Sequence, residues 1–147
     1  MNLSERLNED MKALMKSGDK FALTVVRMIR SAVKNAEIDA RRPLSDEEVM
    51  DILTREVKQR RDALQEFEKA GREDLADQAK AEVEVIQRYM PQPLTEAELT
   101  RIVEETIQEV GASSKADMGK VMSALMPKVK GRADGKQVNA AVQRLLV

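Results

Sequence analysis

Apolar residues recur three and four positions apart along almost the whole chain, a spacing that predicts amphipathic α-helices and not strands. The clearest stripe runs through Val25, Val26, Ile29 and Val33. Capping residues, glycines and prolines divide this pattern into successive predicted helices. The predicted helices cover residues 3–17, 20–42, 46–70, 72–90, 96–110, 115–127 and 135–146.

The helix starts are predicted from short polar side chains that can accept a hydrogen bond from the first turn. Three starts carry a capping-box pair, in which a glutamate follows the capping residue three positions later. Three other starts carry a single capping residue. The pairs are Asn2 with Glu5, Ser45 with Glu48, and Thr95 with Glu98; the single caps are Asp19, Ser114 (with Asp117 in the first turn) and Asp134.

The sequence Pro91-Gln92-Pro93 is the strongest interruption of the helical pattern, because two prolines this close cannot lie inside a helix. We therefore predict an all-α protein with a domain boundary at this point. Residues 1–92 are expected to form a four-helix N-terminal bundle, and residues 93–147 a smaller three-helix C-terminal domain. A chain of 147 residues is long enough to bury a substantial core.

Composition supports the helical prediction and shows an uneven charge distribution. Charged residues make up 35% of the chain and aromatic residues 2%, and the formal net charge is −1. Residues 111–147 hold seven basic and two acidic side chains, a balance of +5, so the first 110 residues carry −6. Such a dipolar chain suggests that the C-terminal part has an acidic partner.

The chain has no cysteine and no histidine, which excludes disulfides, thiolate nucleophiles and the usual zinc ligands. Acid–base chemistry would therefore depend on Asp, Glu, Lys or Tyr89, and no spacing singles out a pair of them. Ser113-Ser114-Lys115 is explained by a helix cap. The Gly131–Lys136 segment is one residue short of a phosphate-binding P-loop. We expect no catalytic residue, no metal and no cofactor.

No apolar run is long enough to span a bilayer, and the N-terminal sequence lacks the pattern of a signal peptide. The expectation from these features is a cytoplasmic protein with no membrane contact.

Basic residues cluster around two predicted helix starts in the C-terminal part, where free backbone N–H groups favour an anion. The alternative is that the glycines only form turns and the lysines are simply solvated. A glycine inside the predicted helix at position 119 suggests that another helix or a ligand backbone approaches there. Met118, Met122 and Met126 are expected in the core. The candidate nucleic-acid-binding residues are Lys120, Lys128, Lys130, Arg132 and Lys136.

A second basic feature lies on the predicted helix 20–42, where Arg27, Arg30 and Lys34 follow one another at helical spacing. This row is either a solvated face paired with acidic neighbours or a surface that tracks phosphates. Arg60 falls within the apolar stripe of the helix 46–70, and we expect it to be paired with a glutamate.

The segments TVVRMIRSAVKNAEID, DMGKVM and KGRADGK resemble the YqeY family, and the similarity covers essentially the whole chain. That family is related to the tail of GatB, a subunit of the glutamine-dependent aspartyl/glutamyl-tRNA amidotransferase. The resemblance implies two helical domains and an association with a carbon–nitrogen ligase. It also implies that tRNA, and amidotransferase or synthetase components, are partners.

The resemblance places the family strings on residues 117–122 and 130–136, which contain Lys120, Lys130, Arg132 and Lys136. These are the side chains that a tRNA backbone could contact. The parts of the amidotransferase that perform the chemistry are absent from this chain, so the resemblance implies an accessory role. The alternative is a helical protein–protein adaptor that does not bind RNA directly.

Overall fold

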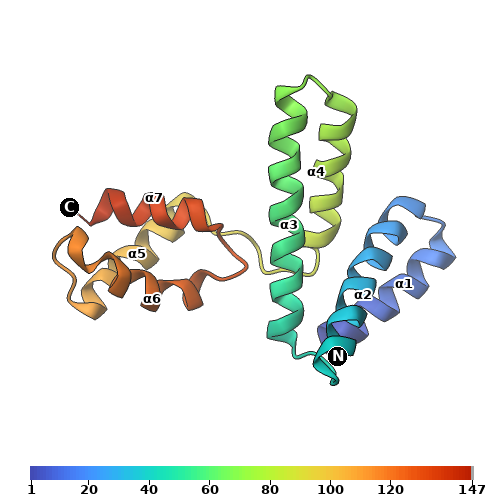
Figure 1. Cartoon of the computed structure of the whole chain (residues 1–147), viewed down its shortest axis with the longest axis horizontal. Helices are drawn as coiled ribbons and strands as arrows, with labels where there is room; N and C mark the ends of the chain where they lie inside the picture. The colour runs from blue at the N-terminus through green and yellow to red at the C-terminus, as the bar shows by residue number, and fades with distance from the viewer. Residues whose placement is uncertain (147) are drawn as a thin grey trace. The chain divides into compact units, whose positions relative to one another are not determined.

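The computed structural model describes residues 1–146 and contains helices joined by turns and short loops, with no strand in that range, which confirms the all-α prediction (Figure 1). The predicted capping boxes at Asn2 and Ser45 are confirmed. Thr95 caps its helix by accepting from the Glu98 N–H, but the reciprocal bond of the predicted box is not formed, whereas Asp134, predicted as a single cap, forms a box with Gln137. The elements are α1 (Leu3–Ser17), α2 (Lys20–Ala40), α3 (Asp46–Lys69), α4 (Glu73–Gln87), α5 (Glu96–Val110), the one-turn 3-10 helix η1 (Lys115–Asp117), α6 (Met118–Val129) and α7 (Gly135–Leu145).

The chain divides into two compact units, Met1–Met90 and Pro91–Val147, which we call unit 1 and unit 2. Each has its own hydrophobic core. That each unit is an independently folding domain remains a prediction.

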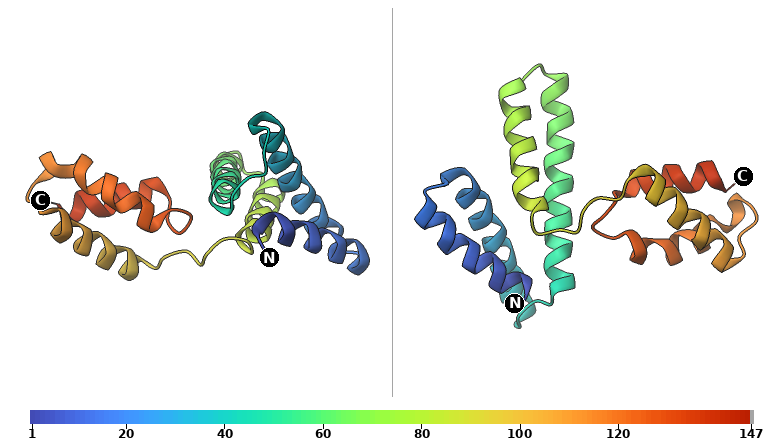
Figure 2. Two further views of the ribbon diagram at one scale, coloured as in Figure 1. Left: turned by 90° about the horizontal axis from the view of Figure 1, so that it is seen from below. Right: turned by 180° about the vertical axis from the view of Figure 1, so that it is seen from behind.

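Unit 1 consists of two helical hairpins, α1–α2 and α3–α4 (Figure 2). Gly18 ends α1 in the left-handed conformation, with φ at 79°, and so reverses the chain into α2. The apolar faces of the four helices share one core, in which Val26, Val49, Leu53 and Ile86 are fully buried. Helix α4 ends at Gln87, earlier than the predicted residue 90, because residues 88–90 form a turn ahead of Pro91.

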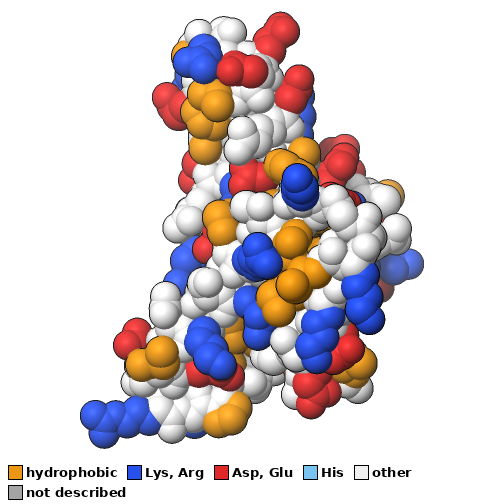
Figure 3. Space-filling model, turned by 90° about the vertical axis from the view of Figure 1, so that its right-hand side faces the viewer, with side chains coloured by type: hydrophobic (Ala, Val, Ile, Leu, Met, Phe, Trp, Pro, Cys, Tyr) orange, Lys and Arg blue, Asp and Glu red, His pale blue; other side chains and the backbone are white. Residues whose placement is uncertain are grey.

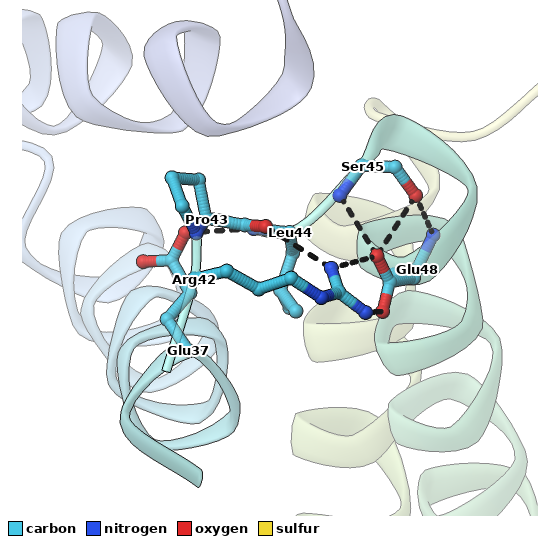
Figure 4. A network of polar contacts seen from close by, with 6 residues as sticks. All are labelled: Glu37, Arg42, Pro43, Leu44, Ser45 and Glu48. Carbon is cyan, nitrogen blue, oxygen red and sulfur yellow. Dashed lines mark hydrogen bonds and ion pairs between the residues drawn. The ribbon is translucent and has the colours of Figure 1, made fainter. Parts of the chain in front are cut away.

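The corner between α2 and α3 is fixed by a polar network (Figure 4). The Arg42 guanidinium donates to both Glu48 carboxylate oxygens at 2.7 and 2.8 Å. Glu48 also accepts from the Ser45 backbone N–H, and Glu37 accepts from the Leu44 N–H at 3.0 Å. Helix α2 ends at Ala40, two residues before the predicted end, because Arg41 takes the left-handed conformation and Pro43 disfavours a helical Arg42.

This network predicts a specific dependence of stability on pH. Hydrogen bonds from Arg42 and from the Ser45 backbone lower the pKa of Glu48 from 4.5 to about 2. Because this pKa is lower in the folded state, the stabilisation from Glu48 is complete above about pH 4.5 and is lost as the pH falls towards 2. We expect Glu48→Gln, which keeps the cap but removes the charge, to destabilise the protein at neutral pH and to have a much smaller effect near pH 2.

Urea unfolding of Glu48→Gln and the parent protein across this pH range measures the effect. Glu84→Gln is a matched control, since Glu84 is exposed and has no ion pair among residues 1–146. An equal loss of stability at pH 2 and pH 7 for Glu48→Gln would contradict the assignment.

Three further sets of contacts join the elements of unit 1. Arg60 on α3 forms ion pairs with Glu56 on the same helix and with Glu82 on α4, which confirms the expected pairing. Tyr89, which follows α4, is buried and donates its hydroxyl to Asp10 on α1 at 2.7 Å. The Arg6 guanidinium lies 4.7 Å from the centre of the Tyr89 ring. The Arg60 ion pairs join α3 to α4, and the two Tyr89 contacts hold α1 against the end of α4.

Unit 2 packs α5, α6 and α7 around Val103, Val121, Leu125 and Val138, all fully buried. Met118 and Met122 pack partly buried against this core, as predicted, but Met126 is 38% exposed, so its predicted core position is wrong. Met126 lies beyond the edge of the buried stripe, which runs through positions 121, 125 and 129.

The start of α6 differs from the prediction. Ser114 caps the short helix η1, by accepting from the Ala116 N–H, and α6 begins only at Met118. The Asp117 carboxylate turns back to accept from the Ser113 N–H at 2.9 Å. The short side chains of Ser114 and Asp117 can each accept from nearby backbone N–H groups. The sequence pattern alone therefore does not show whether α6 begins after Ser114 or after Asp117.

Candidate nucleic-acid interface

Helix α5 supplies carboxylates that pair with much of the basic charge of unit 2. Lys128 donates to Glu109 at 2.7 Å and to the buried Thr106 hydroxyl at 3.0 Å. Arg132 lies 3.8 Å from Glu98 and donates to the Gln92 carbonyl at 3.2 Å. Two of the five predicted nucleic-acid-binding residues therefore hold unit 2 together, one between α5 and α6 and one at the start of the unit.

The two helix starts proposed as anion sites already contain carboxylates of the protein. At α7, the Asp134 side chain accepts from the Gln137 N–H at 2.8 Å. Before α6, Asp117 accepts from Ser113, and this hydrogen bond lowers the pKa of Asp117. Because these carboxylates use the N–H groups that a phosphate would need, the helix starts themselves are poor phosphate sites.

The other three predicted residues, Lys120, Lys130 and Lys136, are exposed. The side chains of Lys120 and Lys136 form no hydrogen bond or ion pair among residues 1–146, although the Lys120 charge contributes to the lowered pKa of Asp117. The same holds for Lys115, which the sequence pattern did not single out because the Ser-Ser-Lys triplet is explained by a cap. Lys120 and Lys130 are ten residues apart along α6 and its cap, which corresponds to about 15 Å. Lys120 and Lys130 therefore lie at opposite ends of α6.

Gly119 lies in the first turn of α6 and is exposed. A Cβ atom built at this position would have no neighbour within 4 Å, so no other segment of the described chain approaches it. The part of the prediction that placed another helix of this chain against Gly119 is wrong. Approach of a ligand from outside the chain remains a prediction.

The basic row on α2 lies partly in a groove between α1 and α2. This groove has a volume of about 230 Å³ and is lined by Arg30 and Lys34 together with Glu5 and Glu37. The row was expected either to pair with acidic neighbours or to track phosphates. Arg27, Arg30 and Lys34 form no ion pair among residues 1–146, although two carboxylates line the same groove.

Tyr89 and the carboxylates are among the groups from which any acid–base or metal chemistry was expected to come. Burial raises the pKa of Tyr89, and its hydrogen bond to Asp10 raises it further, so the phenol is a poor general base. Within residues 1–146, no three carboxylates lie close enough together to hold a metal ion. No helix in that range is both long and apolar enough to cross a bilayer.

The chain is similar to fungal proteins named altered inheritance of mitochondria protein 41, mitochondrial. It is 30% identical to the Pyrenophora tritici-repentis protein over 144 residues, which cover 96% of this chain and 79% of the relative. It is 39% identical to the Candida glabrata protein over 100 residues, which cover 66% of this chain and 55% of the relative. The match to the Candida glabrata protein therefore spans little more than half of that relative's length.

The names of these relatives contradict the expected cytoplasmic location, because they describe mitochondrial proteins. The expectation relied on the absence of a signal peptide and of an apolar span, and neither feature identifies the compartment of a helical protein.

The model of the family described as Yqey-like protein matches residues 4–146, which include both units and all five candidate cations. This match confirms the resemblance seen in the DMGKVM and KGRADGK strings. The chain belongs to the YqeY-like family.

Proposed function

We propose that this protein binds tRNA through unit 2 and acts as a non-catalytic accessory to a tRNA amidotransferase. The lysines that contact the RNA backbone are Lys115, Lys120 and Lys136. Lys128 and Arg132 shape the surface but are held by Glu109 and Glu98.

The observation that carries this proposal is the exposed pair Gly119-Lys120 on α6. A glycine costs up to about 1 kcal/mol relative to alanine in a helix interior, and less in the first turn, where Gly119 lies. No neighbour within the described chain accounts for this cost. A backbone that approaches from outside would account for it, because the absent side chain lets a phosphate reach the helix surface next to the Lys120 ammonium.

The test is to measure tRNA affinity with Lys120→Glu combined with Lys136→Glu. Both residues are exposed and make no internal ion pair among residues 1–146, so the fold should persist. We expect affinity to fall at least tenfold. We also expect the slope of log affinity against log salt to become shallower by about 0.7 to 0.9 for each phosphate that the variant no longer neutralises.

The matched control is the double variant Arg55→Glu with Lys58→Glu, which reverses the charge of two exposed residues of unit 1. The control and the Lys120/Lys136 variant then have the same net charge. Affinity should change less than twofold in this control. An equal loss of affinity in both double variants would mean that only net charge matters, and an unchanged affinity in the first would remove the proposed interface.

One observation favours the alternative function, a protein–protein adaptor. Residues 91–147 contain eight basic and seven acidic residues, so unit 2 carries only +1 once the carboxylates of α5 are included. If the parent protein shows no salt-dependent binding of tRNA, the adaptor function replaces the tRNA-binding proposal.

A further inference from the structure

The outer face of α2 has an exposed seam whose residues are not part of the buried core of unit 1. Its positions alternate three and four residues apart, which is the heptad spacing of helices that pair with another helix. Every position is exposed, and the three large apolar residues Phe21, Met28 and Ile38 are exposed by 41%, 42% and 68%. The seam consists of Phe21, Thr24, Met28, Ser31, Asn35 and Ile38.

A row of three cations borders this seam. Lys20, Arg27 and Lys34 are spaced seven residues apart, are exposed, and form no ion pair among residues 1–146. At 3.6 residues per turn, the seam lies between the buried stripe of α2 and this basic row. Figure 3, which faces the side of unit 1 where α1 and α2 lie, shows exposed hydrophobic side chains bordered by Lys and Arg.

We propose that this seam is a docking site for an acidic amphipathic helix of another protein. In paired helices, the flanking charges select the partner, and an unneutralised basic row selects glutamate or aspartate at the facing positions. Helix α2 has 21 residues, which gives three heptads and a contact length of about 31 Å. A partner helix of that length would cover the three apolar side chains and neutralise the three cations.

The polar positions of the seam are compatible with being covered. The Thr24 hydroxyl already donates to the Lys20 carbonyl at 2.9 Å. When a partner helix covers Thr24, the hydroxyl therefore keeps a hydrogen-bond acceptor within α2. Thr24 and Ser31 are small and leave room for larger partner side chains. Asn35 occupies the kind of seam position where a single polar residue fixes the alignment of two helices at some cost in affinity.

Other occupants match these residues less well. A nucleic-acid backbone would neutralise Lys20, Arg27 and Lys34 but would leave Phe21 and Met28 exposed to water. Antiparallel pairing with a second copy of α2 would bring the two basic rows together, which is unfavourable. An acidic helix satisfies both the apolar and the charged positions.

The test uses two synthetic 21-residue helical peptides with leucine at the a and d positions. One has glutamate at e and g, and the other has lysine there. Fluorescence anisotropy measures the binding of each to the full chain. We expect the glutamate peptide to bind at least tenfold more tightly than the lysine peptide, and amide NMR shifts to follow the outer face of α2.

Two variants separate the contribution of the seam from that of the basic row. Phe21→Ser with Met28→Ser removes the apolar contacts, and replacing Lys20, Arg27 and Lys34 with glutamate reverses the basic row. Each should weaken binding of the glutamate peptide at least tenfold, and circular dichroism should show an unchanged helix content. Reversing Arg55, Lys58 and Arg101, three exposed cations outside α2, is the matched control and should change binding less than twofold.

Equal binding of both peptides, an equal effect of the control variant, or NMR shifts away from α2 would overturn the proposal. The proposal would also be overturned if tRNA, but not the glutamate peptide, shifted the amide NMR signals of the α2 seam. The experiment is independent of the tRNA proposal, because Lys120 and Lys136 are unchanged in every variant.

Discussion

Replacing Leu125 with alanine is expected to unfold unit 2 and to leave unit 1 folded. Leu125 on α6 is 0% exposed and lies at the centre of the unit 2 core. A buried Leu→Ala substitution costs about 2–5 kcal/mol, because it removes apolar contacts and leaves a cavity. A core in a unit this small rarely supplies more than about 3–5 kcal/mol, so the loss is comparable with its whole stability.

The reciprocal substitution is Leu53→Ala on α3, since Leu53 is also 0% exposed but belongs to the core of unit 1. Hydrogen exchange followed by mass spectrometry reports each unit separately. With Leu125→Ala, amides of residues 91–146 should lose protection while those of residues 1–90 keep it, and Leu53→Ala should mainly affect residues 1–90.

An exposed apolar substitution, Ile38→Ala, should change the protection of neither unit and serves as the control. If each core substitution lowers protection equally throughout residues 1–146, the chain unfolds as one cooperative body. The predicted boundary between two domains at residues 92–93 would then be wrong.

The helix starts could be predicted from the sequence because their determinants are local. Asn2, Ser45 and Asp134 each accept from an N–H three residues later, so residue type and spacing suffice. The ends were less predictable. Helix α2 stops at Ala40 because Arg41 adopts a positive φ, and nothing about an arginine signals that conformation.

The candidate interface could be predicted only in part, because its electrostatics depend on contacts between distant residues. Lys128 and Glu109 are 19 residues apart, and Arg132 and Glu98 lie on different segments of unit 2. A count of basic residues in the C-terminal segment therefore overstated the charge that RNA could contact.

The seam on α2 was present in the sequence but could not be separated from the core stripe. Phe21 and Met28 are apolar and adjoin the buried stripe through Val25, Val26 and Ile29, so the sequence pattern alone assigns them to the same face. Only the exposure of each position distinguishes the two patterns.

Replacing Arg60 with methionine is expected to cost about 3 kcal/mol of folding stability. The Arg60 side chain is 13% exposed and pairs with Glu56 and Glu82. Removing one member of such a cluster leaves partly buried carboxylates without their counter-charge, and breaking a buried ion pair typically costs about 3–5 kcal/mol. Methionine keeps most of the volume and apolar contacts of the arginine stem, so the destabilisation reports charge and not packing.

A triple variant separates the two contributions. Combining Arg60→Met with Glu56→Gln and Glu82→Gln removes the unpaired charges, and we expect urea unfolding to show that at least half of the stability returns. The exposed pair Arg72 and Asp74 provides the control, because Arg72→Met should cost less than about 1 kcal/mol. The triple variant could instead be no more stable than Arg60→Met alone. Arg60 would then stabilise the α3–α4 hairpin through its packing and its hydrogen bond to the Glu56 carbonyl, and not by neutralising the two carboxylates.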